Sequence, residues 1–257
     1  MTAQNDKAIA FRNLHIPGTP LVLYNIWDAG SAKAVELAGA AALATGSWSV
    51  AAAQGHGDGG ELPLDAALRL ARQIVTGTDQ PVTFDFEGAY AFSPEDVGAH
   101  TRKLIETGVI GLNFEDQVVG KAGLHAITDQ AERIRAIRSA ANEAGVSIFI
   151  NARTDLFLKA EPGTDHASLI EHAIEREAAY REAEADGYFI PGLTRSELIR
   201  NICERARLTI NVMAGDGFDD IAAIEKLGVA RVSFGPYPYI ALMATLEERA
   251  SKALARR

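Results

Sequence analysis

The sequence predicts an α/β fold, a single (β/α)8 TIM barrel that spans residues 1–257 and begins with a short N-terminal helix. Eight short apolar runs recur along the chain, and amphipathic helical stretches separate them. No linker or change in composition divides the chain, and 257 residues suit one barrel of this kind. A doubly wound open sheet is the alternative. It has little support, because no glycine fingerprint follows the first predicted strand.

The elements follow in order from the N-terminus. Residues 7–18 predict the N-terminal helix, closed by Pro17-Gly18. The eight predicted strands are 21–26, 41–45, 82–86, 109–114, 147–151, 187–190, 208–212 and 229–234. The longest predicted loops follow the second, fourth and fifth strands, at 46–63, 116–128 and 156–165.

Helix ends are marked by their usual residues. Five glycines precede predicted strands, where each is expected to end a helix in the left-handed conformation: Gly39, Gly108, Gly145, Gly187 and Gly228. Ser93-Pro94 indicates a serine cap with proline at the first helical position, and Thr194 to Glu197 has the form of a capping box. In the helix from Asp129, the apolar face leaves Arg133, Arg135 and Arg138 mostly to solvent.

Composition excludes several classes of protein. With 47% hydrophobic and 23% charged residues, the chain can build a large core. Its formal net charge of -9 and the lack of a basic stretch argue against nucleic-acid binding. Cys203, the single cysteine, excludes an internal disulfide and is expected to be buried and inert. Because no secretory or membrane-spanning segment is recognisable, no membrane association and a cytoplasmic location are expected.

Three predicted strands run into charged residues. Asp85 and Glu87 end the third, and Glu115 follows the fourth. Grouped carboxylates are costly unless a cation lies between them, and Mg2+ prefers such oxygen ligands. We therefore expect a metal site of Asp85, Glu87 and Glu115, with the first two on one face of a strand if the strand stays regular. Alternatively, Glu87 caps the next helix or pairs with a lysine.

Other polar residues at the strand ends are candidates for binding an anionic substrate. Arg153 offers a planar fork that suits a carboxylate, although an ion pair with Asp155 or Glu115 is the structural alternative. Gly46-Ser47 can present backbone N–H groups to an anion, or can form an ordinary turn. Asn211 ends the seventh strand. Asp58 lies in a glycine-rich segment, 55–60, that can close over a ligand or simply form a flexible turn.

At these positions the chain resembles the isocitrate lyase and phosphoenolpyruvate mutase superfamily over nearly its whole length. The matching segments are Thr45-Gly46-Ser47-Trp48-Ser49, Gly57-Asp58-Gly59, Asp85-Phe86-Glu87-Gly88-Ala89-Tyr90, Asn113-Phe114-Glu115-Asp116-Gln117, Lys121 and Asn151-Ala152-Arg153-Thr154-Asp155. The resemblance implies an enzyme that uses Mg2+, with Mn2+ as a possible substitute, on a small anionic 2-oxo carboxylate.

The resemblance also assigns roles. Asp85, Glu87 and Glu115 would hold the metal, directly or through water, and Gly46, Ser47 and Arg153 would bind the substrate. Thr45 and Asn211, at the ends of predicted strands, are further candidates for substrate binding. Asp58 and Lys121 would lie near the reacting bond, and Lys121, His125, His56 or a water could serve as the acid, although composition alone places Lys121 and His125 in a surface loop. Family members often exchange a C-terminal helix between subunits, so a homo-oligomer is expected.

The chain departs from the family pattern at the loop after the fourth strand. Family lyases carry Lys-Lys/Arg-Cys-Gly-His there, and Gly123 replaces the cysteine that serves as their acid or base. This argues against a standard isocitrate or methylisocitrate lyase. The mutase-like Lys-x-Asn is absent too, and Glu87 stands where the family usually has aspartate.

These residues leave three functions to weigh. The first is an enzyme that cleaves or rearranges a C–C or P–C bond beside the oxo group, as in oxaloacetate or phosphonopyruvate chemistry. A 2-oxo acid binding protein that has lost its acid or base is the second. An aldolase working through a lysine Schiff base is the third, and no predicted strand ends in the lysine that it needs.

Overall fold

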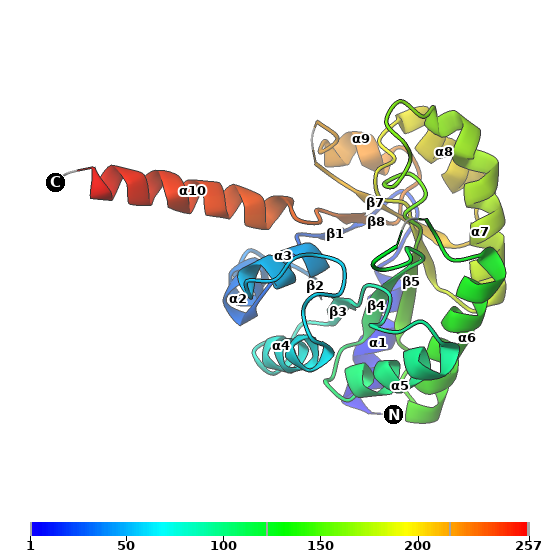
Figure 1. Cartoon of the computed structure of the whole chain (residues 1–257), viewed down its shortest axis with the longest axis horizontal. Coiled ribbons are helices and arrows are strands. Elements are labelled where there is room, and N and C mark those ends of the chain that lie inside the picture. Colours follow the sequence, from blue (N-terminus) through cyan, green and yellow to red (C-terminus); the bar gives the residue numbers. More distant parts are fainter. Residues whose placement is uncertain (1, 122, 216, 256–257) are drawn as a thin grey trace.

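A computed structural model describes residues 2–121, 123–215 and 217–255. It contains one sheet of eight parallel strands in the order β1-β8-β7-β6-β5-β4-β3-β2. The isolated parallel bridge between Ile26 and Thr45 links the chain after β1 to the chain after β2, so the sheet curls into a (β/α)8 barrel (Figure 1). The predicted fold is confirmed, and the open sheet is excluded.

Strands and helices alternate around this barrel, and each of the eight predicted strands overlaps an observed one. The strands are β1 (Leu21–Leu23), β2 (Leu43–Ala44), β3 (Val82–Asp85), β4 (Gly111–Glu115), β5 (Phe149–Arg153), β6 (Gly187–Phe189), β7 (Thr209–Met213) and β8 (Arg231–Ser233). The helices are α1 (Ala3–Asn13), α2 (Ala29–Leu37), α3 (Ser47–Ala53), α4 (Leu64–Thr76), α5 (Pro94–Ile105), α6 (Ile127–Ala144), a 3-10 helix (His166–Leu169), α7 (Ile170–Glu182), α8 (Ser196–Arg205), α9 (Ile221–Glu225) and α10 (Tyr237–Leu254).

Several local predictions were wrong. The N-terminal helix is Ala3–Asn13 rather than 7–18, because Thr2 caps it by accepting from the backbone N–H of Asn5. Part of the predicted loop 46–63 is helical, as α3. The expected capping box at Thr194 is absent, since α8 has Arg195 at its N-cap without a side-chain bond. Ser93 does cap α5, by accepting from Asp96 at 3.1 Å.

The prediction of a left-handed conformation is confirmed for four of the five glycines, and Gly187 is the exception. Before β6, Glu184 takes the left-handed conformation, with φ 67°. Gly187 is instead the first residue of β6, where an added Cβ would lie 2.7 Å from Oδ1 of Asn151 and 2.9 Å from the Phe149 ring. Close packing inside the barrel, rather than a helix end, therefore requires glycine there.

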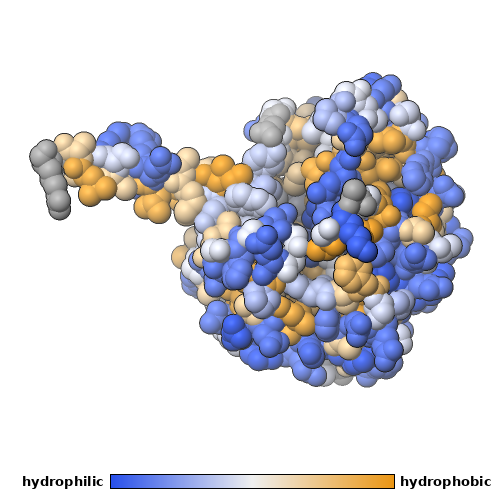
Figure 2. Space-filling view, in the orientation of Figure 1, coloured by the Kyte–Doolittle hydropathy of each residue, from blue (hydrophilic) through white to orange (hydrophobic). Residues whose placement is uncertain are grey.

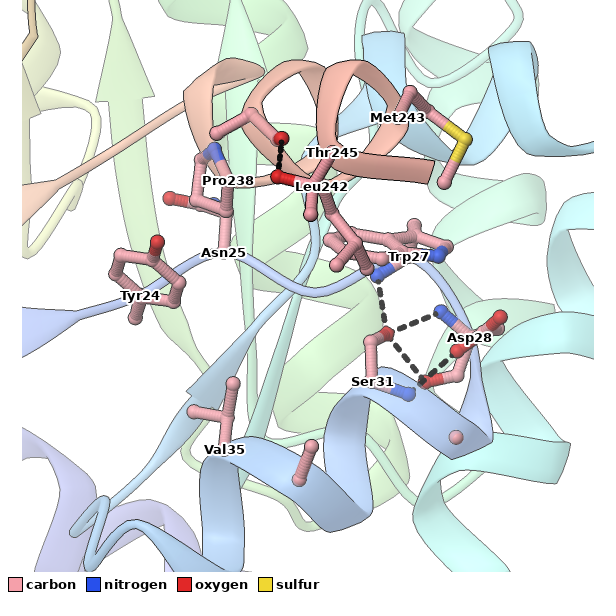
Figure 3. Close-up of a pocket in the computed structure, with 13 residues that line it drawn as sticks. Tyr24, Asn25, Trp27, Asp28, Ser31, Val35, Pro238, Leu242, Met243 and Thr245 are labelled. Carbon is pink, nitrogen blue, oxygen red and sulfur yellow. Dashed lines mark hydrogen bonds between the residues drawn. The ribbon is translucent and has the colours of Figure 1, made fainter. Parts of the chain in front are cut away.

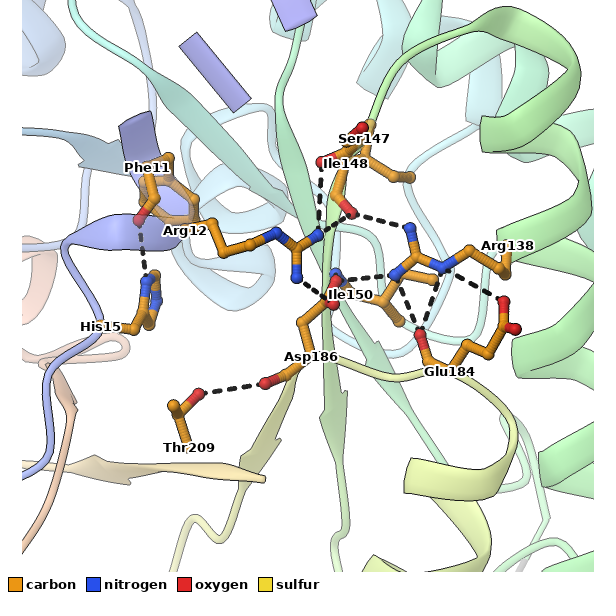
Figure 4. Close-up of polar contacts among 10 residues, drawn as sticks. All are labelled: Phe11, Arg12, His15, Arg138, Ser147, Ile148, Ile150, Glu184, Asp186 and Thr209. Carbon is orange, nitrogen blue, oxygen red and sulfur yellow. Dashed lines mark hydrogen bonds and ion pairs between the residues drawn. The ribbon is translucent and has the colours of Figure 1, made fainter. Parts of the chain in front are cut away.

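The N-terminal ends of the strands are fixed by an ion-pair network (Figure 4). Asp186 pairs with Arg12 from α1 and with Arg138 from α6, the latter at 2.7 Å. It also accepts from the backbone N–H of Ile150 at 2.8 Å. The side chain of Arg138 is only 11% exposed, so the expectation that it faces solvent was wrong for this residue.

Helix α10 projects away from the barrel (Figure 1), and apolar residues are visible on it in Figure 2. Ile240, Leu242 and Leu246 are 44%, 50% and 59% exposed. A groove of about 620 Å³ lies between the base of α10 and the segment from Tyr24 to Val35 (Figure 3). No helix in the described ranges is long and apolar enough to cross a membrane.

Candidate active site

The carboxyl ends of the strands surround a cavity of about 250 Å³. Five predicted site residues line it: Gly46, Ser47, Asp58, Asp85 and Arg153. Asn113, Phe189, Met213 and Ser233 line it as well, so β4, β6, β7 and β8 also contribute. A second cavity of about 280 Å³ is lined by Glu87 and His125, together with Tyr90, Phe92 and Arg133. Seven of the predicted site residues are thus divided between two cavities, and the other four line neither: Thr45, Glu115, Lys121 and Asn211.

Asp85 is the acid of the first cavity. It ends β3 and is 8% exposed, and its Oδ2 accepts from the backbone N–H of Ser47 at 2.9 Å. Its other oxygen, Oδ1, is buried with no hydrogen-bond partner. Thr45 positions the strand end, because its hydroxyl accepts from the Asp85 backbone N–H at 2.8 Å.

Glu87 does not continue the strand, so it does not share a strand face with Asp85. Its φ is 50°, and Ala89 and Tyr90 are also left-handed, at 60° and 55°. Such conformations cost about 1–3 kcal/mol each and persist only where surrounding contacts impose them. Here Arg133 imposes the turn, since its Nη2 donates to the carbonyls of Gly88 and Ala91, both at 2.9 Å.

Arg133 is therefore buried, at 2% exposed, which corrects the prediction that it faces solvent. Its guanidinium carbon lies 4.7 Å from the centre of the Phe114 ring, and burial lowers its pKa to about 10. Arg135 is exposed, as predicted. The helical periodicity did not predict that Arg133 is buried, because the groups that it binds are backbone carbonyls on a turn that is distant in the sequence.

Burial, with a smaller contribution from neighbouring carboxylates, raises the pKa values of the acidic group. Burial, then the nearby Asp85 and Asp58 carboxylates, raise the pKa of Glu87 to about 7. Oε2 of Glu87 is buried without a partner, and Oε1 accepts from the Tyr90 hydroxyl at 3.3 Å. Burial also raises the pKa of Glu115, although Arg153 opposes this.

Arg153 ends β5 and forms both ion pairs that the sequence left open. Its Nη1 lies 3.1 Å from Oε2 of Glu115, and its Nε lies 2.6 Å from Oδ1 of Asp155. Asp155 is held in turn by Asp116, whose Oδ1 accepts from the Asp155 backbone N–H at 2.9 Å. Asp116 thus fixes the position of Arg153, and Arg176 and Tyr180 both donate to its other oxygen.

The backbone N–H groups proposed for an anion are both in use. That of Gly46 donates to Ile26 at 3.2 Å, and that of Ser47 donates to Asp85. Asn211 lies beneath the cavity, where its side chain is within 3.3 Å of the Ser233 hydroxyl. Asn25, which sequence reasoning missed, accepts from the backbone N–H groups of Phe234 and Gly235, and so joins β1 to the loop after β8.

The remaining candidates lie on loops. Asp58 lies in the lining of the first cavity, where partial loss of solvent, and then the nearby Asp85, raise its pKa. Lys121 is exposed, and its Nζ lies 6.0 Å from the centre of the Phe92 ring, beside the second cavity. Burial lowers the pKa of His125. Gly123 is exposed with φ 94°, and no atom lies within 4 Å of where its Cβ would be.

The donor set fits a cation. Asp85 and Glu87 each carry a buried oxygen with no partner, which a positive charge would satisfy. Among the described residues, no three His, Cys, Asp or Glu side chains converge as a preformed metal cage.

A family model described as phosphoenolpyruvate phosphomutase matches residues 11–254. The chain belongs to this family. A candidate phosphonomutase from Burkholderia cenocepacia J2315 is 44% identical, with a TM-score of 0.94 over 97% of this chain and 99% of its own. An uncharacterised Mycobacterium tuberculosis protein is 31% identical over 91% of this chain and 84% of its own.

Two further similar proteins carry named activities. The 2-methylisocitrate lyase of Escherichia coli is 29% identical over 91% of this chain and 79% of its own. A phosphonopyruvate hydrolase, solved with oxalate and Mg2+, is 20% identical, with a TM-score of 0.83 over 96% of this chain and 86% of its own. At that identity it supports the fold alone. The family is one of enzymes.

Proposed function

We propose that the chain is a Mg2+-dependent enzyme that acts on a small 2-oxo carboxylate and cleaves or rearranges a bond beside the oxo group through an enolate-like species. The observation that carries this proposal is the pair of unpartnered, buried carboxylate oxygens on Asp85 and Glu87, with the fixed guanidinium of Arg153 lining the same cavity as Asp85. Such an arrangement is costly for a protein that binds no cation.

Asp85, Glu87 and Glu115 would hold the metal, directly or through water, and Mn2+ would be a possible substitute for Mg2+. When bound, the metal supplies positive charge that stabilises the developing enolate oxygen.

Arg153 orients the carboxylate of the substrate. Glu115 and Asp155 fix its fork, so little side-chain entropy is lost on binding. Gly46 and Ser47 contact the substrate at the start of α3, while Thr45 and Asn211 act indirectly, by positioning Asp85 and Ser233. Asp58, which lines the first cavity, acts near the reacting bond in this proposal. Lys121 and His125, on the β4–α6 loop beside the second cavity, are the alternative acids or bases.

Two kinds of reaction would pass through the enolate-like species. One is decarboxylation or hydrolysis of an oxaloacetate-type acid, and the other is P–C chemistry on phosphonopyruvate. A screen of oxaloacetate, phosphonopyruvate and branched malates for Mg2+-dependent release of pyruvate or acetate tests the proposal. Mg2+-dependent binding without turnover across the screen would favour a 2-oxo acid binding protein instead, as Gly123 in place of the lyase cysteine suggests.

We also propose a homo-oligomer in which α10 of a second copy occupies the groove of Figure 3. Trp27, Val35 and Leu242 give this groove an apolar lining, and α10 exposes apolar residues of its own. Self-association buries both surfaces, which are large for a monomer to leave in water.

A further inference from the structure

We propose that Gln130 and Arg133 position the cation site and set the size of the ion that it accepts, in favour of Mg2+ over Ca2+. This inference rests on the proposed function, in which Glu87 and Glu115 hold the metal. It concerns two side chains of α6 that are not themselves part of the metal site. Because they act through the two glutamates, they are positioning residues.

Gln130 and Arg133 are buried polar residues on one face of α6. They lie three positions apart, so their side chains are neighbours on the helix, and they are 0% and 2% exposed. Oε1 of Gln130 accepts from Nη1 of Arg133, and the guanidinium lies over the Phe114 ring. Burial of such groups is costly unless hydrogen bonds compensate for the lost water. The bonds that the pair makes outside α6 therefore indicate its role.

These two side chains close a ring of hydrogen bonds that contains both glutamates. Nη2 of Arg133 donates to the carbonyl of Gly88 at 2.9 Å, and Gly88 directly follows Glu87. Nε2 of Gln130 donates to the carbonyl of Glu115 at 3.0 Å. The backbone N–H of Glu115 donates to the carbonyl of Glu87, also at 3.0 Å, and this bond completes the ring. Helix α6 thus fixes the backbone of Glu87 relative to that of Glu115.

Neither side chain of the pair is suited to bind a cation itself. Gln130 is fully buried and lines neither cavity, and its one acceptor atom already accepts from Arg133. Arg133 carries a positive charge and has no acceptor atom. Any effect of these residues on cation binding must therefore pass through Glu87 and Glu115.

A site whose ligands are held in fixed positions discriminates between ions by their size. Mg2+ requires nearly octahedral oxygen ligands at about 2.0–2.1 Å, whereas Ca2+ accepts less regular ligands at about 2.3–2.6 Å. The ring, together with the left-handed backbone of Glu87, restricts how far the two glutamates can move apart. Loosening the ring should therefore weaken the binding of Mg2+ more than that of Ca2+.

Calorimetric titrations with Mg2+ and with Ca2+ test this inference. Each is done in the presence of pyruvate, a 2-oxo carboxylate with no group to lose, and compares wild type with Gln130→Met, which has a similar shape but makes neither hydrogen bond of Gln130. We expect wild type to bind Mg2+ more tightly than Ca2+. In the variant, we expect the affinity for Mg2+ to fall about tenfold, as for other residues that orient metal ligands, with a smaller loss for Ca2+.

Glu177→Met is the matched control. Glu177 is a buried residue of α7 that also makes two hydrogen bonds, since its Oε1 accepts from the backbone N–H groups of Arg207 and Leu208. This substitution should lower stability and leave both affinities unchanged.

The outcomes separate the two proposals. If wild type binds no Mg2+, the proposed function fails and the inference with it. If wild type binds Mg2+ and folded Gln130→Met keeps the wild-type ratio of the two affinities, the inference is overturned and the proposed function stands. An equal change of this ratio in Glu177→Met would overturn the inference too, because general loosening of the barrel would then be the cause.

A second variant decides the question if circular dichroism shows that Gln130→Met does not fold. Arg133→Lys keeps the positive charge, but an ammonium on a flexible stem lacks the planar fork that holds Gln130 and Gly88 in one geometry. We expect the same change in the ratio of the two affinities. The wild-type ratio in folded Arg133→Lys would overturn the inference.

Discussion

The backbone N–H of Ser47 donates to Oδ2 of Asp85 at 2.9 Å, while Oδ1 of the same carboxylate is buried without a partner. The first contact fixes the orientation of the carboxylate across two neighbouring strand ends. The other oxygen, Oδ1, is buried without a hydrogen bond to compensate for its loss of water. Together the two observations describe an acid that is held in place for a ligand.

Removing the charge of Arg153 should destabilise the protein as well as abolish substrate binding. In Arg153→Met, the carboxylates of Glu115 and Asp155 lose their shared partner, at a cost of about 3–5 kcal/mol. Chemical denaturation measures this loss. Arg153→Lys should recover part of the stability but little oxalate binding, since an ammonium lacks the planar fork. Full oxalate affinity in the lysine variant would contradict the role of Arg153.

His15 should make stability depend on pH. Burial, and then the charge of Arg231, lower the pKa of His15 to about 3, and its ring stacks on Phe149. Because the unfolded chain binds this proton more readily, the stabilisation is complete above about pH 6.5 and is lost as the pH falls toward 3. Denaturation of wild type and His15→Gln between pH 7 and pH 4 should show a weaker pH dependence in the variant. Equal slopes would refute this.

Asp186 should contribute strongly to stability, since it joins α1, α6 and the start of β5 (Figure 4). Asp186→Ala leaves two guanidinium groups without this partner, and we expect a loss of about 2–3 kcal/mol in the free energy of unfolding. Glu171→Ala serves as the control, because the Glu171–Arg205 pair is exposed and its loss should not be measurable. Similar losses in both variants would contradict the prediction.

Light scattering should find wild type in an assembly larger than one chain. Leu242→Glu combined with Leu246→Glu places charge on the apolar side of α10 and should give a monomer. Glu247→Ala with Glu248→Ala is the matched control on the same helix, and it should leave the assembly intact. A monomeric wild type would rule out the proposed homo-oligomer.

The barrel could be predicted because the sequence repeats its signal at every strand, as an apolar run followed by a helix. Arg153 and Asp85 could be found because a charge at the end of a buried strand is costly without a partner. Glu87 was harder, since its left-handed backbone depends on Arg133, which lies 46 positions away. The role of Gly187 and the burial of Arg133 were also missed for this reason. Both depend on contacts between segments that are distant in the sequence, and local patterns do not reveal such contacts.

The most direct test of the proposed metal site is a calorimetric titration of Mg2+ in the presence of oxalate, with wild type, Asp85→Asn and Asp28→Asn. Asp28 caps α2 outside the cavity, and asparagine caps helices equally well, so its substitution is a control. We predict saturable Mg2+ binding by wild type and Asp28→Asn, and none by Asp85→Asn. Unchanged Mg2+ binding by a folded Asp85→Asn variant would contradict the site.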